Sequence, residues 1–112
     1  MSIMQDIGNT VIKDDADNNH RMFFECIEKG DCNAVETFLS DGIEPNIRNS
    51  IGWTALMVAV TFGKPRIVQL LLDKGAEVNA QSFSGLTAYR MASYAKHNEI
   101  IQMLKNAGAQ ES

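Results

Sequence analysis

The chain has 112 residues, a net charge of −4, 45% apolar residues and 21% charged residues, which fits one globular domain with a modest core. Lysine and arginine are not clustered, so nucleic-acid binding, which needs basic side chains against the phosphates, is not expected. The apolar run 55–60 is too short to cross a bilayer and no basic segment followed by an apolar one opens the sequence, so we expect a cytoplasmic protein without membrane contact.

Residues 1–16 precede any repeated pattern and carry much of the negative charge, with three aspartates against one lysine. Apolar residues at positions 3, 7 and 11 would share one side of a short helix, but Gly8 and Asn9 interrupt it. Three interpretations stay open for this acidic segment. It is a loosely held tail, a partial cap on the structure that follows, or an arm that contacts a partner.

Residues 17–47 read as two helices joined by a tight turn. Asp17, Asn18 and Asn19 are favourable residues for a helix start, and the two helical segments read MFFECIEKG and NAVETFLSDG. Asn19 and Arg21 stand where the later segments have a glycine and a threonine. This divergence is typical of the terminal unit of an array, which shows one face to water.

The segments 48–80 and 81–110 repeat each other at a spacing of 33 residues. The shift superposes Gly52 on Gly85, Thr54 on Thr87, Ala59 on Ala92, Ile67 on Ile100, Leu71 on Leu104 and Gly75 on Gly108. Self-similarity at a fixed period of this length indicates stacked supersecondary units.

Local chemistry gives each unit its helix boundaries. Thr54 and Thr87 precede apolar runs, where a threonine oxygen accepts from a free backbone N–H at a helix start. Gly75 and Gly108 follow leucine-rich runs, where glycine takes the left-handed conformation that ends a helix. We therefore predict two helices in each unit.

The period and the residues resemble the ankyrin repeat. The matching positions of the middle unit are Gly52, Thr54, Leu56, Ala59, Gly63, Ile67, Val68, Leu70, Leu71, Leu72, Gly75, Ala76, Val78, Asn79 and Ala80. The resemblance implies an all-α ankyrin-repeat solenoid over residues 17–112. It would contain about three stacked helix-turn-helix repeats, over 17–47, 48–80 and 81–110, joined by short β-turn or hairpin loops.

The chain departs from the ankyrin pattern at a few positions. Ala55 and Ala88 replace the proline at the first helical position, and Met57 and Arg90 replace the histidine that usually hydrogen-bonds the threonine. Lys96 replaces the glycine of the short reversal, where we expect strain or a different turn.

The resemblance implies a function in binding another protein, through the turn tips and the concave face of the first helices. The positions of this chain that fall there are Arg48, Ser50, Ile51, Trp53, Phe62, Gln81, Phe83, Leu86, Arg90 and Tyr94. Four of them are aromatic, and aromatic anchors carry much of the energy at protein interfaces. The competing interpretation is that some of these side chains, Phe62 especially, complete the core.

Two alternatives to a general binding module stay open. One is an inhibitor or immunity-type protein that covers a target enzyme or toxin. The other is a self-associating structural protein, so that the chain is a monomer or a weak homodimer. No cofactor, metal or enzymatic activity is expected, since His20 and His97 lie in distant repeats and the spacing of Cys26 and Cys32 matches no metal site.

Overall fold

A computed structural model describes residues 18–110 of the chain. The predicted tail 1–16 and the predicted cap at Asp17 lie outside these residues. Within them, helices follow one another in antiparallel pairs, as the repeat pattern predicts.

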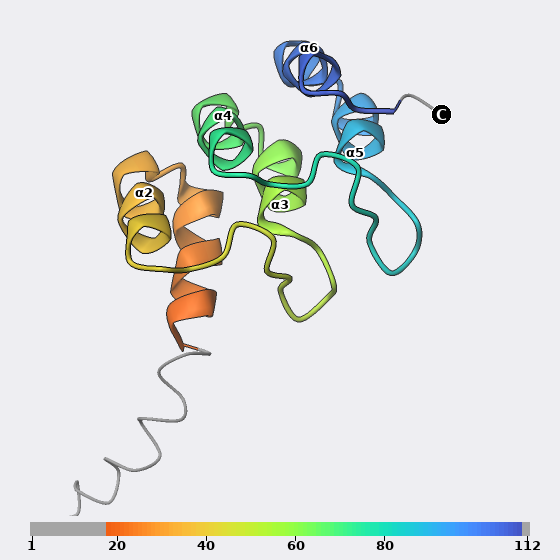
Figure 1. Cartoon of the computed structure of the whole chain (residues 1–112). Coiled ribbons are helices and arrows are strands. Elements are labelled where there is room, and N and C mark those ends of the chain that lie inside the picture. The colour runs from red at the N-terminus through yellow and green to blue at the C-terminus, as the bar shows by residue number, and fades with distance from the viewer. Residues whose placement is uncertain (1–17, 111–112) are drawn as a thin grey trace, which may run out of the picture.

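The helices form two rows, shown in Figure 1. We call the first helix of each pair an inner helix and the second an outer helix. The inner helices are the helix over residues 18–29, α3 (Ala55–Thr61) and α5 (Ala88–Ala95). The outer helices are α2 (Cys32–Ser40), α4 (Pro65–Asp73) and α6 (Asn98–Asn106). Each of the helices α2 to α6 packs on its pair partner or on the equivalent helix of the next pair, which confirms the ankyrin-like stack.

The threonines predicted to start the inner helices do so. Thr54 Oγ1 accepts from the backbone N–H of Met57 at 3.3 Å, and Thr87 Oγ1 accepts from that of Arg90 at 3.3 Å. Met57 also accepts from the Thr54 N–H through its sulfur, at 3.4 Å. The thioether thus provides a second contact at a position where the ankyrin pattern has histidine.

The reversal inside each helix pair has the same geometry in all three repeats. Its central residue has positive φ, 82° at Gly30, 67° at Gly63 and 60° at Lys96. The following N–H donates to a carbonyl five residues back, for example from Lys64 to Ala59 at 3.0 Å. For Lys96 the sequence predicted either a strained turn or a different turn. The turn is the same one, and it is strained because a side chain in this conformation crowds the backbone.

The outer helices end as predicted, at glycines with positive φ. Gly75 has φ 98° and Gly108 has φ 96°. Around each glycine the chain turns into the loop of the next unit. An asparagine of the preceding repeat binds the backbone of this loop. Asn46 donates to the carbonyl of Gly75 at 3.2 Å and accepts from the N–H of Glu77 at 2.7 Å.

The core lies between the two rows and between successive repeats. Every residue of α3 from Ala55 to Val60 is buried, since this helix has neighbours on both sides. The outer helices contribute one buried stripe each, for example Ile67, Val68 and Leu71 from α4. An amphipathic helix of this kind packs one face and leaves the other in water.

The first repeat differs from the other two at its start. Residues 18–21 are already helical, whereas the equivalent residues 51–54 belong to a hairpin and end at the N-cap of α3. The helix therefore begins earlier than the segment MFFECIEKG that the sequence indicated. Asn18 lies inside the helix, where its side-chain oxygen accepts from Arg21 at 2.8 Å.

Candidate partner-binding site

Two hairpins project from the inner-helix side of the stack, away from the outer helices (Figure 1). Each hairpin is closed by one antiparallel bridge, between Arg48 and Thr54 in the first and between Gln81 and Thr87 in the second. The segments 49–63 and 78–89, which contain the tips, hold no charged residue. The hairpin tips are therefore uncharged as well as prominent.

In each hairpin, one side-chain oxygen accepts hydrogen bonds from two backbone N–H groups of the tip. Asn49 Oδ1 accepts from the backbone N–H groups of Ile51 and Trp53 at 3.1 and 3.0 Å. In the second hairpin Ser82 Oγ takes this place and accepts from Ser84 and Leu86 at 3.3 and 3.1 Å. Short polar side chains stabilise turns in this way, so both tips hold a defined conformation.

Arg48 joins the two hairpins. Its Nη1 donates to the carbonyl of Gly52 in its own hairpin at 2.7 Å and to the carbonyl of Gln81 in the next at 2.8 Å. Hydrogen bonds with an ionised donor are the stronger kind. The guanidinium predicted to contact a partner is thus engaged within the chain, where it sets the spacing of the tips.

Phe83 is the most exposed of the large apolar side chains among the described residues. The exposed fractions are 81% for Phe83, 66% for Tyr94, 59% for Ile51 and 48% for Phe62. Exposure of the Phe62 ring contradicts the expectation that it completes the core. Trp53 and Leu86, in contrast, are partly buried and pack against the core.

The predicted residues fall in two places. Arg48, Ser50, Ile51 and Trp53 belong to the first hairpin, and Gln81, Phe83 and Leu86 belong to the second. Arg90 lies exposed in the first turn of α5, Tyr94 lies in its last turn, and Phe62 follows the last residue of α3. Since a helix rises about 1.5 Å per residue, the two ends of an inner helix such as α5 lie roughly 12 Å apart, and the hairpin tips lie beyond its first residue.

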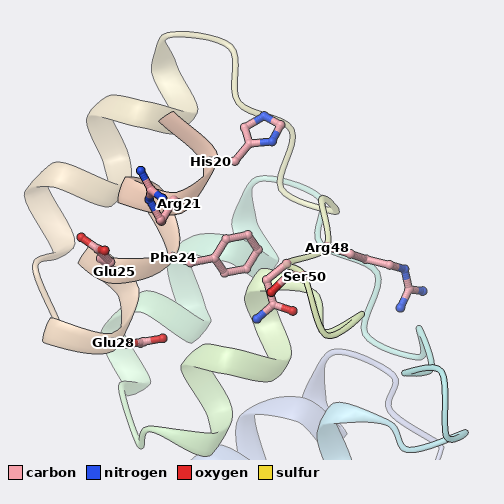
Figure 2. Close-up of a pocket in the computed structure, with 8 residues that line it drawn as sticks. His20, Arg21, Phe24, Glu25, Glu28, Arg48 and Ser50 are labelled. Atoms are coloured by element: carbon pink, nitrogen blue, oxygen red, sulfur yellow. The ribbon is translucent and has the colours of Figure 1, made fainter. Parts of the chain in front are cut away.

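A groove beside the first hairpin was not predicted. It has a volume of about 670 Å³ and is lined by His20, Arg21, Phe24, Glu25, Glu28, Arg48, Asn49 and Ser50. Figure 2 shows the Phe24 ring directed toward Ser50, while Glu25 leaves the helix on the other side and Arg48 points away. No pattern in the sequence indicates this groove, because its two walls are brought together only by the stacking of the first two repeats.

The groups that could support catalysis or metal binding do not converge. His20 lines the groove, whereas the His97 ring lies against Gly63 at the opposite end of the helices. Partial burial raises the pKa of the Cys26 thiol, and the nearby Asp31 carboxylate adds to this effect. Over residues 18–110, no three potential metal ligands of the His, Cys, Asp or Glu type come together.

A comparison with protein families matches residues 23–111 to a model of ankyrin repeats in three copies. The chain belongs to the ankyrin-repeat family. Ankyrin repeats are generally protein–protein interaction modules and are typically non-enzymatic. A search of curated proteins gave no match. In the part of the chain that the structure describes, no helix combines the length and the apolar character needed to span a bilayer.

Proposed function

We propose that this ankyrin-repeat protein is a non-catalytic module that binds another protein through its two hairpins and its inner-helix face. The observation that carries the proposal is the Phe83 ring, which is 81% exposed at the tip of an uncharged hairpin. A large aromatic side chain in this position contributes little to folding, and aromatic side chains are enriched among the residues that dominate interface energies.

The rigidity of the hairpins supports the same proposal. Asn49 and Ser82 hold the two tips from within, and Arg48 ties them together. A surface that is already ordered loses less conformational entropy when a partner binds. The tips are therefore suited to recognition of a folded surface.

Tyr94 and Phe62 extend the surface along the inner helices. Both rings are about half exposed or more, and both project from the ends of inner helices rather than from the outer row. Ile51, at the first tip, is also exposed. Apolar side chains spread in this way over one side of a protein mark a contact site more often than isolated ones do.

The test is affinity capture from a native lysate with the wild-type protein and with an Ile51→Ala/Phe83→Ala/Tyr94→Ala variant. We expect at least one protein to be retained by the wild type and lost with the variant. A Gln69→Ala protein is the control, because Gln69 is exposed on the outer helix α4 and therefore lies outside the proposed surface. Circular dichroism and thermal unfolding verify that all three proteins are folded.

Trp53 is left intact in this variant because it packs against the core. Retention of the same proteins by the triple variant would refute the proposed surface. If nothing is retained by any of the three, the molar mass of the wild type is measured by light scattering over a range of concentrations. A mass that rises with concentration and stays constant in the triple variant would instead identify a second copy of the chain as the partner.

A further inference from the structure

The reversals between inner and outer helices carry a cluster of cations. Lys29, Lys64 and Arg66 line a hollow of about 380 Å³, together with Gly30, Cys32, Gly63, Pro65 and Ile67. No carboxylate lines the hollow, so its charge has one sign. By the topology of the helix pairs it lies at the opposite end of the helices from the hairpins.

The three cations have no partner within residues 18–110. Neither the two ammonium groups nor the Arg66 guanidinium forms a hydrogen bond or an ion pair there. Two carboxylates flank Lys29 in the sequence. Glu28 lines the groove beside the first hairpin, and Asp31 caps α2, where it accepts from the Ala34 N–H at 3.1 Å. Neither carboxylate lines the hollow, so the mutual repulsion of the cations inside it is only partly relieved.

One of these cations lies close to the backbone of the neighbouring reversal. The Lys64 side chain lies over Gly30, and a Cβ at that glycine would stand 3.3 Å from its Cδ and from its Nζ. Lys64 also precedes α4, whose first turn has no acidic residue and no side-chain cap. The positive end of this helix adds to the field of the cluster.

The neighbouring reversal extends the same charge. The His97 ring lies against Gly63, at 2.9 Å from the position of an added Cβ, so the two reversals are in contact. Lys96, which precedes His97, is exposed. Four basic residues therefore lie along three successive reversals. The acidic residues of these reversals, Glu28, Asp31 and Glu99, belong to the first and third, so the positive charge is concentrated at the middle one, on a chain whose overall charge is −4.

We propose that this cationic face binds a short acidic segment of a protein partner, rich in aspartate or glutamate. The negative charge of the rest of the molecule favours a short acidic peptide over a long polyanion as the partner. A long polyanion such as a nucleic acid would extend past the reversals and be repelled by the acidic remainder, whereas a short segment contacts the cations alone. This second surface does not depend on the hairpin surface.

The experiment uses a fluorescein-labelled octaglutamate peptide and measures anisotropy at about 20 mM and about 150 mM NaCl, a range over which screening of exposed charges changes strongly. We expect the full chain to bind the peptide and the affinity to fall with salt. Lys64→Glu should weaken binding at least tenfold, and Arg66→Gln should weaken it by a smaller factor.

Lys74→Glu is the matched control, because Lys74 caps the other end of α4 and the substitution changes the net charge equally. We expect it to change the affinity by less than about twofold, since Lys74 lies a helix length away. An Ile51→Ala/Phe83→Ala variant, changed only in the two hairpins, should bind the peptide like the wild type, which separates this proposal from the hairpin proposal. Circular dichroism shows that each variant is folded.

Two results would overturn the inference. One is the absence of peptide binding at low salt, or an equal loss with Lys64→Glu and Lys74→Glu. The other is tighter binding of a labelled eight-nucleotide oligothymidylate at the same residues, which would assign the face to phosphates rather than to carboxylates.

Discussion

The phenyl ring of Phe83 lies against the backbone of Gly52, one hairpin away. A Cβ added to Gly52 would stand 2.5 Å from two carbons of the ring, closer than carbon atoms approach each other without displacement. Gly52 also has φ 87°, a conformation that favours glycine. One glycine thus permits the turn of its own hairpin and provides the seat for the most exposed aromatic side chain of the next.

Gly52→Ala should therefore destabilise the protein more than Gly85→Ala does. Gly85 has the same φ of 87° but has open space where its Cβ would lie, so that variant reports backbone strain alone, about 1–2 kcal/mol. In Gly52→Ala the methyl group must also displace the Phe83 ring. Urea unfolding gives both free energies of unfolding, and equal losses would show that the ring is not seated on Gly52.

Arg48→Met should loosen the hairpins by removing both hydrogen bonds while keeping the apolar stem of the side chain. We expect a loss of about 1–2 kcal/mol in the free energy of unfolding and faster amide exchange in the hairpins. Gln81→Ala is the control, because Arg48 binds the backbone carbonyl of Gln81 and not its side chain. Similar exchange rates in the two variants would contradict the bridging role of Arg48.

Lys96→Gly should stabilise the protein by about 1 kcal/mol, because Lys96 has φ 60° and ψ 36° and a glycine adopts this conformation without strain. The opposite change at the equivalent position, Gly63→Ala, should destabilise it. There the strain of φ 67° is joined by contact with His97, 2.9 Å from the added Cβ. Thermal unfolding measures both, and a lower melting temperature for Lys96→Gly would disprove the strain at this reversal.

The Cys26 thiol should make stability fall at alkaline pH. Partial burial and the Asp31 carboxylate raise its pKa in the folded protein, so the unfolded chain loses this proton first as the pH rises. The contribution is fully present below the thiol pKa of the unfolded chain, about 8.5, and is lost as the pH rises through the folded value. The measurement is the free energy of unfolding from pH 7 to pH 10.

Cys26→Ala is the reference for this titration, because lysine and tyrosine side chains also titrate in the alkaline range. The difference between wild type and variant should be constant up to about pH 8 and then change in favour of the variant. A constant difference over the whole range would show that folding leaves the thiol pKa unchanged.

The sequence was sufficient to predict the fold where local chemistry and the repeat agree. Thr54 and Thr87 cap helices, and Gly63, Gly75 and Gly108 have the positive φ that their positions indicated. Each of these residues acts on its own turn of backbone. A signal that depends only on near neighbours is readable in a single chain, and the 33-residue repeat multiplies it.

The site was harder to predict because its side chains act across repeats. Arg48 was expected at the surface as a partner contact, yet its guanidinium reaches carbonyls of two hairpins. Trp53 and Leu86 were placed beside Phe83 on the same surface, but these two pack partly against the core. Whether a tip residue faces inward depends on the rotation of the hairpin, which the sequence pattern does not specify. Binding by the ten residues stays a prediction.

The asparagine that holds one loop is found again one unit later, with the same partners. Asn79 donates to the carbonyl of Gly108 at 3.2 Å and accepts from the N–H of Gln110 at 2.8 Å, just as Asn46 does with Gly75 and Glu77. The middle unit therefore carries both halves of this contact. Its Asn79 bonds the loop of the following unit, and its Gly75 carbonyl and Glu77 N–H bond the asparagine of the preceding unit. A chain with residues 48–80 duplicated in tandem would reproduce these hydrogen bonds between the copies, so the loop junction itself places no limit on the number of units.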